Sequence, residues 1–192
     1  MTMPKNELKL DKATHLYTLG DRKLISVTQA ISVLDTRWRD PWYLERGRLI
    51  HLATAYYDRN ELDESTVDPQ IAPYIESYIK FRMNTDFEPT LIEQQLYHPQ
   101  YFYAGTLDRQ GSLNGNQAII DIKSGVRVDV DELQETAYWE LCRSNKIPIK
   151  KLFDLYLKGN GSMPSLVPVE NPKNLLPVFL AALTLTRWKE KI

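Results

Sequence analysis

The sequence predicts an α/β (α+β) fold in which a central mixed sheet is flanked by helices. Helix-starting residues recur over 26–83, and the two-residue period of strands takes over at 91–123. Helical spacing returns at 131–144 and is followed by an apolar strand at 152–158. From Trp42 onward, with the third helix set aside as an insertion, the order is α-β-β-β-α-β, which favours an α/β sandwich.

The first elements are a hairpin and a capped helix. Two short apolar runs, 16–19 and 23–25, flank Gly20-Asp21, a pair typical of a tight turn. Ser26 and Gln29 have the spacing of a capping box, in which the serine caps the helix and the glutamine reaches back to the backbone. A helix should therefore begin directly after Ser26.

Two aspartate–proline pairs predict the next two helices. In Asp40-Pro41 the aspartate is a cap and the proline fits the first turn, so we expect a helix from there to about Tyr57. Asp68-Pro69 repeats the pattern and predicts a third helix to about Met83.

The remaining elements follow from period and turn residues. Asn114-Gly115 is typical of a type I′ turn and should join two strands of the sheet. Asn171-Pro172 should start the last helix. The strands expected in this half of the chain are 91–97, 101–110, 117–123 and 152–158.

Composition bounds the class of protein. The 192 residues, 43% of them hydrophobic and 26% charged, suit one domain over 1–192, divided into a hairpin and helix at 1–40, a core at 41–160 and a C-terminal helix at 161–192. Cys142 is the single cysteine, which excludes an internal disulfide and a thiolate zinc site. No apolar leader or membrane-length run is present, so we expect a cytoplasmic protein without a membrane partner.

A net charge of -1 argues against a surface that binds polyanions everywhere. Binding of nucleic acid would need positive charge concentrated locally. Two groups of cationic residues meet that need: Arg37, Arg39, Arg46 and Arg48, and Arg143, Lys146, Lys150 and Lys151.

Asp121 and Lys123 are the first candidate site residues. Side chains alternate along a strand, so both project to one face with Ile119, while Ile120 and Ile122 project to the other. Taken alone, such a pair is commonly a structural ion pair. Asp108, on the preceding strand, favours a metal site instead, because the hairpin brings its carboxylate close to that of Asp121. Bound Mg²⁺ or Mn²⁺ would remove the repulsion between the two carboxylates.

Further polar residues occur at helical and strand spacing. Gly47 and His51 share one helix face, and a glycine inside a helix is costly enough to suggest that something approaches closely. Gln134 and Tyr138 are likewise one turn apart on the helix after the third strand. Each could equally be an ordinary packed or surface residue. Glu93, on the first strand of the core, is an additional acidic candidate or a solvent-facing residue.

These motifs together resemble the RecB-like branch of the PD-(D/E)XK nuclease superfamily, including its small phage- and mitochondrial-type exonucleases. That branch has Gly-x-x-x-His, Gly-x-x-Asp, Asp-x-Lys and Gln-x-x-x-Tyr in this order, matched here at 47–51, 105–108, 121–123 and 134–138. The resemblance covers about residues 24–158. Leu107 stands where the superfamily's name has proline, a replacement common in this branch.

The resemblance implies a restriction-endonuclease-like core with a catalytic site. His51, Asp108, Asp121 and the backbone carbonyl of Ile122 would be ligands of Mg²⁺ or Mn²⁺. Lys123 would position the attacking water or stabilise the transition state. Gln134 and Tyr138 would line the site, and touch the DNA backbone or orient Lys123. Without a cysteine set, the iron–sulfur cluster of some relatives is not expected.

DNA is the partner that this resemblance implies. Phosphate contacts and base stacking would come from Trp38, Trp42, Tyr43, Arg46 and Arg48, although tryptophans also serve as core residues. The favoured activity is a DNA exonuclease of recombination, repair or phage DNA processing, acting in a bacterial or phage-infected cell beside a recombinase, annealing protein or helicase. The alternatives are a structure-specific or restriction-type endonuclease and a non-catalytic nucleic-acid-binding module.

Overall fold

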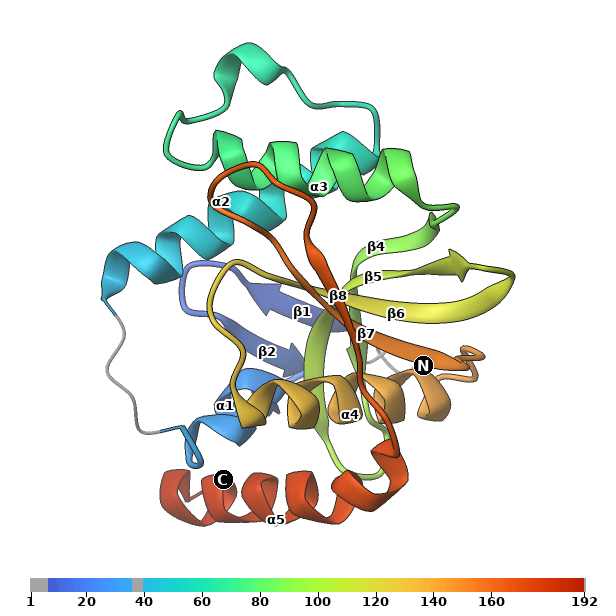
Figure 1. Cartoon of the computed structure of the whole chain (residues 1–192). Helices are drawn as coiled ribbons and strands as arrows, with labels where there is room; N and C mark the ends of the chain where they lie inside the picture. Colours follow the sequence, from blue (N-terminus) through green and yellow to red (C-terminus); the bar gives the residue numbers. More distant parts are fainter. Residues whose placement is uncertain (1–6, 36–39, 192) are drawn as a thin grey trace, which may run out of the picture.

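A mixed sheet with helices on both faces forms the molecule (Figure 1), as the sequence predicts. The computed structural model describes residues 7–35 and 40–191; Arg37, Trp38 and Arg39 lie outside this range. The helices are α1 (Val27–Ser32), α2 (Pro41–Asp58), α3 (Ala72–Asn84), α4 (Asp129–Ser144) and α5 (Pro172–Glu190), with a short 3-10 turn η1 (Glu64–Thr66). The strands are β1 (Leu8–Asp11), β2 (Leu16–Leu19), β3 (Arg22–Ser26), β4 (Glu88–Tyr97), β5 (Tyr103–Leu113), β6 (Asn116–Lys123), β7 (Lys151–Tyr156) and β8 (Ser165–Pro168).

The sheet has the strand order β1-β2-β3-β5-β6-β7-β8, and β4 pairs with β5 outside this path. The pairs β3–β5 and β6–β7 are parallel, whereas the other pairs are antiparallel. The predicted core order is present as α2-β4-β5-β6-α4-β7, with α3 inserted after α2. The strands β1 and β8, at the edges of the sheet, were not predicted.

Each face of the sheet has its own apolar core. Ile119 packs with side chains of α1, α4 and α5 on one face. Ile120 and Ile122 pack with side chains of α2 and α3 on the other. The alternation predicted for this strand is therefore confirmed, and it assigns Asp121 and Lys123 to the α4 face.

Local turn and cap chemistry explains most of the element boundaries. The capping box is formed, with Gln29 N–H donating to Ser26 Oγ (3.0 Å) and Ser26 N–H to Gln29 Oε1 (2.8 Å). Asn114 and Gly115 both have positive φ, 50° and 69°, which a type I′ turn requires. Asp40 caps α2 by accepting from Trp42 N–H.

Several predicted boundaries differ from the structure: β4 begins at Glu88 rather than Leu91, and β7 ends at Tyr156 rather than Lys158. Two further differences have a local cause. Helix α3 begins at Ala72 rather than after Asp68-Pro69, because the Asp68 side chain bonds Gln70 N–H in a local turn and Pro73 takes the first-turn position instead. Strand β5 begins at Tyr103 rather than Tyr101, since Phe102 has a φ of 48° and its N–H bonds the carbonyl of His98. None of the helices in 7–35 and 40–191 is both long and apolar enough to cross a membrane.

Candidate metal centre

The site begins where β5 and β6 separate. Their antiparallel pairing ends at Arg109↔Ile120, so Asp108 lies just beyond the paired segment. Its carboxylate Oδ2 accepts the N–H of Ile122 at 2.7 Å, in the place of a backbone acceptor. This side chain therefore fixes the fork between the strands. The contact of Ile122 is made by its N–H; a ligand role for its carbonyl oxygen stays a prediction.

His51, Glu93 and Asp108 converge at this fork. The ring nitrogen Nδ1 of His51, on α2, lies 3.2 Å from Asp108 Oδ1 and 4.0 Å from Glu93 Oε1. One ligand atom from each residue lies within 4.8 Å of the others. Glu93 has a φ of 53°, a left-handed conformation that is costly for a residue with a Cβ and that recurs at functional sites.

Charge within this group stabilises an imidazolium. Burial alone would lower the pKa of His51, but the carboxylates of Asp108 and Glu93 outweigh it and raise that pKa to about 9. Burial favours neutral Asp108, yet His51, the Ile122 N–H and Arg109 together lower the pKa of its carboxyl. Burial and Asp108 raise the pKa of Glu93, against His51 and Arg109. A metal cation could replace the proton on His51, because the donors are one imidazole and two carboxylates.

A chain of polar contacts beside this fork joins Asp121, Lys123, Gln134 and Tyr138. Lys123 Nζ lies 2.5 Å from Asp121 Oδ2 and donates to Gln134 Oε1 at 2.9 Å. Gln134 Nε2 donates to Asp121 Oδ1 and to the Tyr138 hydroxyl, both at 3.3 Å. The glutamine amide thus holds both members of the Asp-x-Lys pair, and the side chain of Lys123 has one defined position.

Three further acidic residues, which the sequence analysis did not identify, surround Lys123. Its Nζ lies 3.7 Å from Asp131 and 3.9 Å from Asp154, and Glu135 groups with Asp121 and Asp154. Burial raises the pKa of Asp121 to about 7 and that of Asp154 to about 6, although Lys123 opposes both shifts. The one sequence feature that could have pointed to Asp154 is an acidic residue inside an apolar strand.

A buried ion-pair network supports the fork from the opposite face of the sheet. The guanidinium of Arg109, which is fully buried, donates to Asp58 Oδ2 at 2.5 Å and to Glu93 Oε1 at 3.0 Å. Arg82 also pairs with Asp58. Arg109 therefore links the end of α2 to the strained residue Glu93, and no motif in the sequence predicted this link.

The residues predicted to contact DNA have different surroundings. Arg46 donates to the carbonyl of Ser124 at 2.9 Å and stacks on Tyr43 and Tyr74, so it holds the loop after β6. Arg48 is exposed and paired with Glu45. Trp42 and Tyr43 are exposed on the first turn of α2. Neither aromatic side chain makes a hydrogen bond within the described residues, although the Arg46 guanidinium lies over the ring of Tyr43.

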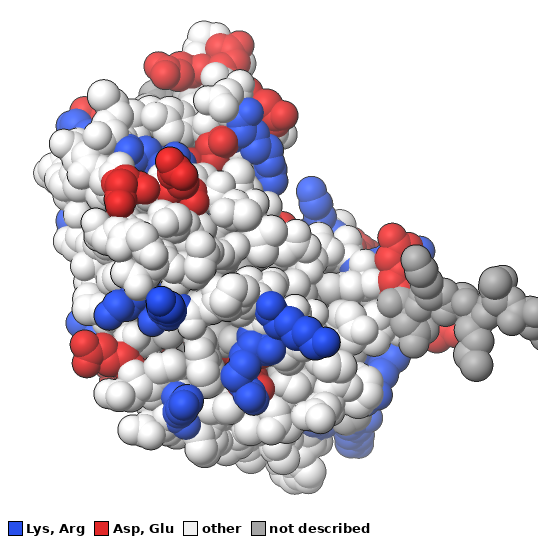
Figure 2. All heavy atoms as spheres, turned by 90° about the vertical axis from the view of Figure 1, so that its right-hand side faces the viewer, with Lys and Arg blue, Asp and Glu red and all other residues white. Residues whose placement is uncertain are grey.

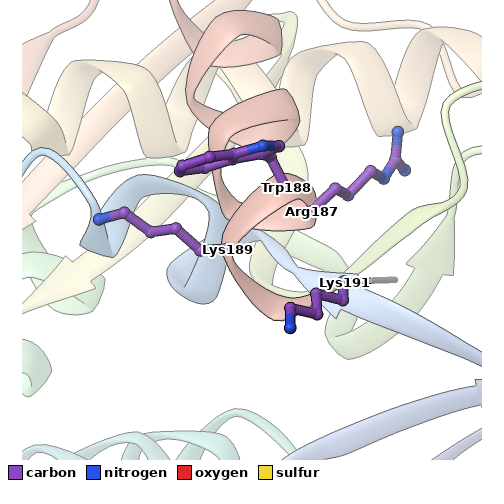
Figure 3. Close-up of a pocket in the computed structure, with 4 residues that line it drawn as sticks. All are labelled: Arg187, Trp188, Lys189 and Lys191. Atoms are coloured by element: carbon purple, nitrogen blue, oxygen red, sulfur yellow. The ribbon is translucent and has the colours of Figure 1, made fainter.

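Two surface hollows lie away from the converging residues. One, of about 650 Å³, is lined by Arg187, Trp188, Lys189 and Lys191 at the end of α5, where Trp188 and Lys189 extend to one side of the helix and Arg187 to the other (Figure 3). A second, of about 800 Å³, lies where α4 ends and α5 begins. Figure 2 shows that Lys and Arg gather in the lower half of one face, with most Asp and Glu above them. Neither hollow includes a residue of the predicted catalytic or metal site, but the second is lined in part by Arg143 and Lys146 of the second cationic group.

Neither a family model nor a curated protein sequence matches the chain. Two solved structures show an overall similarity. LHK-Exo, solved in complex with dAMP, is 7% identical with a TM-score of 0.43, over 86% of this chain and 87% of that chain. SSO0001 is 11% identical with a TM-score of 0.37, over 83% and 82%. The chain is thus similar to both across most of their length, at low sequence identity.

Proposed function

We propose that the protein is a Mg²⁺- or Mn²⁺-dependent deoxyribonuclease that hydrolyses phosphodiester bonds, acting as an exonuclease. The observation that carries the proposal is the convergence of His51, Glu93 and Asp108 beside an Asp121–Lys123 pair held by Gln134. A structural ion pair needs no imidazole and second carboxylate within reach, whereas a phosphate-cleaving site uses both.

The residues fit a divalent cation. His51, Asp108 and Asp121 would hold it, with the carbonyl of Ile122 and with Glu93 as an additional acidic ligand. When bound, Mg²⁺ or Mn²⁺ would stabilise charge on the phosphate and lower the pKa of an attacking water. His51 has to be neutral to act as a ligand, so its raised pKa means that loading releases a proton.

Lys123 has the reactive position in this proposal. Burial lowers the pKa of its ammonium, but the attraction of Asp121, Asp131 and Asp154 is the larger effect. The pKa is therefore raised above its usual value, and the group stays charged. It can donate a hydrogen bond to a phosphate oxygen or to the attacking water. In the reaction the water oxygen bonds to phosphorus, the bridging P–O bond breaks, and the leaving oxygen takes a proton. Gln134 and Tyr138 keep Lys123 in place.

The test is digestion of end-labelled single- and double-stranded DNA with Mg²⁺, comparing Lys123→Ala and Asp121→Ala with the unaltered protein. Loss of a transition-state contact of this kind lowers the rate by about a hundredfold or more. Lys23→Ala is the control, because this exposed lysine of β3 belongs neither to the predicted site nor to either cationic group. Full activity of both site variants would overturn the proposal.

Closed circular DNA separates the subclasses of activity. An exonuclease leaves it intact, whereas a structure-specific or restriction-type endonuclease nicks or linearises it. Binding of DNA without cleavage under any divalent cation would instead indicate a non-catalytic binding module. The ordered motifs support a role in recombination, repair or phage DNA processing, with a recombinase, annealing protein or helicase as partner.

A further inference from the structure

A second group of acidic side chains includes Asp121 and lies between the sheet and α4. Asp121 on β6, Glu135 on α4 and Asp154 on β7 each offer one oxygen within 4.8 Å of the other two. Parallel pairing sets Asp121 directly beside Asp154, and α4 covers both. Their exposed fractions are 2%, 0% and 1%, so water does not solvate these carboxylates.

The hydrogen bonding of this group is incomplete. Both carboxylate oxygens of Glu135 and both of Asp154 are buried and have no hydrogen-bond partner among the described residues. A buried carboxylate without a partner is costly by several kcal/mol, and buried charges in proteins are therefore paired or bound to metal. Glu135 in particular has its whole side chain enclosed and aimed at the other two acids.

The local charge is also unbalanced. Lys123 is the ammonium that faces this group, and it lies 2.5 Å from Asp121 but 3.9 Å from Asp154. It also faces Asp131, whose Oδ2 is already engaged by the Tyr156 hydroxyl and the Val128 N–H. Among the described residues, Lys123 thus serves four carboxylates, three of which have nearly no contact with solvent, and Arg127 adds a longer-range contribution at Asp154.

We propose that Asp121, Glu135 and Asp154 form a second divalent-cation site, distinct from the His51–Glu93–Asp108 group. Asp121 would be a ligand of both cations if it also binds the one held by that group. An all-oxygen set of three carboxylates selects a hard cation, Mg²⁺, Mn²⁺ or Ca²⁺. Ligand oxygens around such an ion lie up to about 4–5 Å apart, twice the metal–oxygen distance of about 2.1–2.5 Å. The observed spacing of at most 4.8 Å needs little rearrangement.

This cation would act on Lys123 through its neighbours. It balances Asp154 and Glu135, so that Asp121 stays ionised and keeps Lys123 in the position bonded by Gln134. It also ties together β6, β7 and α4. The effect on DNA cleavage rests on the proposed function, whereas the binding of the cation does not.

The experiment measures Mn²⁺ bound per chain by the loss of the free-ion electron paramagnetic resonance signal, on metal-free full-length protein without DNA. We expect two ions in the unaltered protein and one in Glu135→Gln and in Asp154→Asn. His51→Ala should lose the other ion and keep this one. Glu132→Gln, on the exposed side of α4, is the matched control and should bind two.

Thermal unfolding supplies a second readout. Mn²⁺ should raise the Tm of His51→Ala and fail to raise that of the double variant His51→Ala/Glu135→Gln. Unchanged Mn²⁺ binding in both Glu135→Gln and Asp154→Asn would overturn the inference and show that protons alone neutralise this group. Absence of DNA cleavage with two bound ions would sink the proposed function and leave the second site standing.

Discussion

Asp121 lies between one ammonium and several carboxylates, and its protonation is linked to folding. Burial raises its pKa to about 7, helped by Asp108 and Asp154 and opposed by Lys123. An unfolded aspartate has a pKa of about 3.9. Between these values the folded state binds the extra proton, so this stabilisation is present below about pH 4 and is lost as the pH rises to about 7.

We therefore expect metal-free protein to lose stability from pH 4.5 to pH 8, and Asp121→Asn to lose less over the same interval. Urea unfolding in the presence of a chelator measures both. Asp63→Asn is the control, since bonds from Ser65 lower the pKa of that exposed carboxyl and confine its effect to acidic pH. Identical pH profiles for Asp121→Asn and the unaltered protein would contradict this assignment.

Asp58 is the principal counter-charge of the fully buried Arg109. Removing one partner of a buried ion pair leaves an uncompensated charge and costs about 3–5 kcal/mol. Asp58→Ala should lower the free energy of unfolding by that amount, measured by urea denaturation. Glu45→Ala, which breaks an exposed pair with Arg48, should change it by less than about 1 kcal/mol. Comparable losses in the two variants would show that the Arg109 network is not stabilising.

Within helix α2, Gly47 is not required by any contact inside the described molecule. A Cβ at this position would meet only Ser124 Oγ, at an ordinary 3.9 Å. Gly47→Ala should therefore stabilise the protein by up to about 1 kcal/mol, the difference in helix propensity. Under the proposed function it should also weaken DNA cleavage, because the added methyl lies beside the loop after Lys123.

Gly105→Ala is the informative comparison for that variant. Its Cβ would lie 2.7 Å from Tyr138 Cε1 and 3.0 Å from Val27 Cγ2, so packing between β5 and α4 must shift. Thermal unfolding should show a higher Tm for Gly47→Ala and a lower Tm for Gly105→Ala. A lower Tm for both would mean that Gly47 has a structural task not visible in its contacts.

At the level of elements, local chemistry made some features predictable. The capping box at Ser26, the turn at Asn114-Gly115 and the shared face of Asp121 and Lys123 depend on neighbours within four residues, and the structure has all three. The predicted start of α3 was wrong because an aspartate can accept a hydrogen bond in a turn as well as cap a helix, and Asp68 does the former. These elements were predictable because the interactions that define them join residues close together in the sequence.

The undetected site residues depend on distant pairings. Asp154 reaches Asp121 only through the parallel register of β6 and β7, which a helix separates along the chain. Glu135 points inward because it lies on the face of α4 that packs on the sheet. Asp58 meets Arg109 across 51 residues. No local pattern specifies such contacts, so the sequence indicated the Asp-x-Lys centre and its neighbouring motif residues but not the buried acids Asp58, Glu135 and Asp154.

Across the whole molecule, stability should be uneven. Strand β1 lies at one edge of the sheet, paired only with β2 within the described sheet, whereas β5 and β6 are bordered by strands on both sides. Hydrogen exchange should therefore show slow amides in β5 and β6 and fast ones in β1. The β3–β5 pairing is limited to two residue pairs, so amides of β2 should exchange at intermediate rates. Uniform protection of all strands would contradict this.

The hairpin at Asn114-Gly115 offers a place to attach the protein to a surface. Both residues are exposed, and nothing lies within 4 Å of a Cβ built on Gly115. About seven strand residues, or roughly 23 Å at 3.3 Å per residue, separate this tip from Lys123. A biotin-acceptor peptide inserted here would lie away from the fork between β5 and β6, so that, under the proposed function, cleavage of single DNA molecules could be watched on a surface.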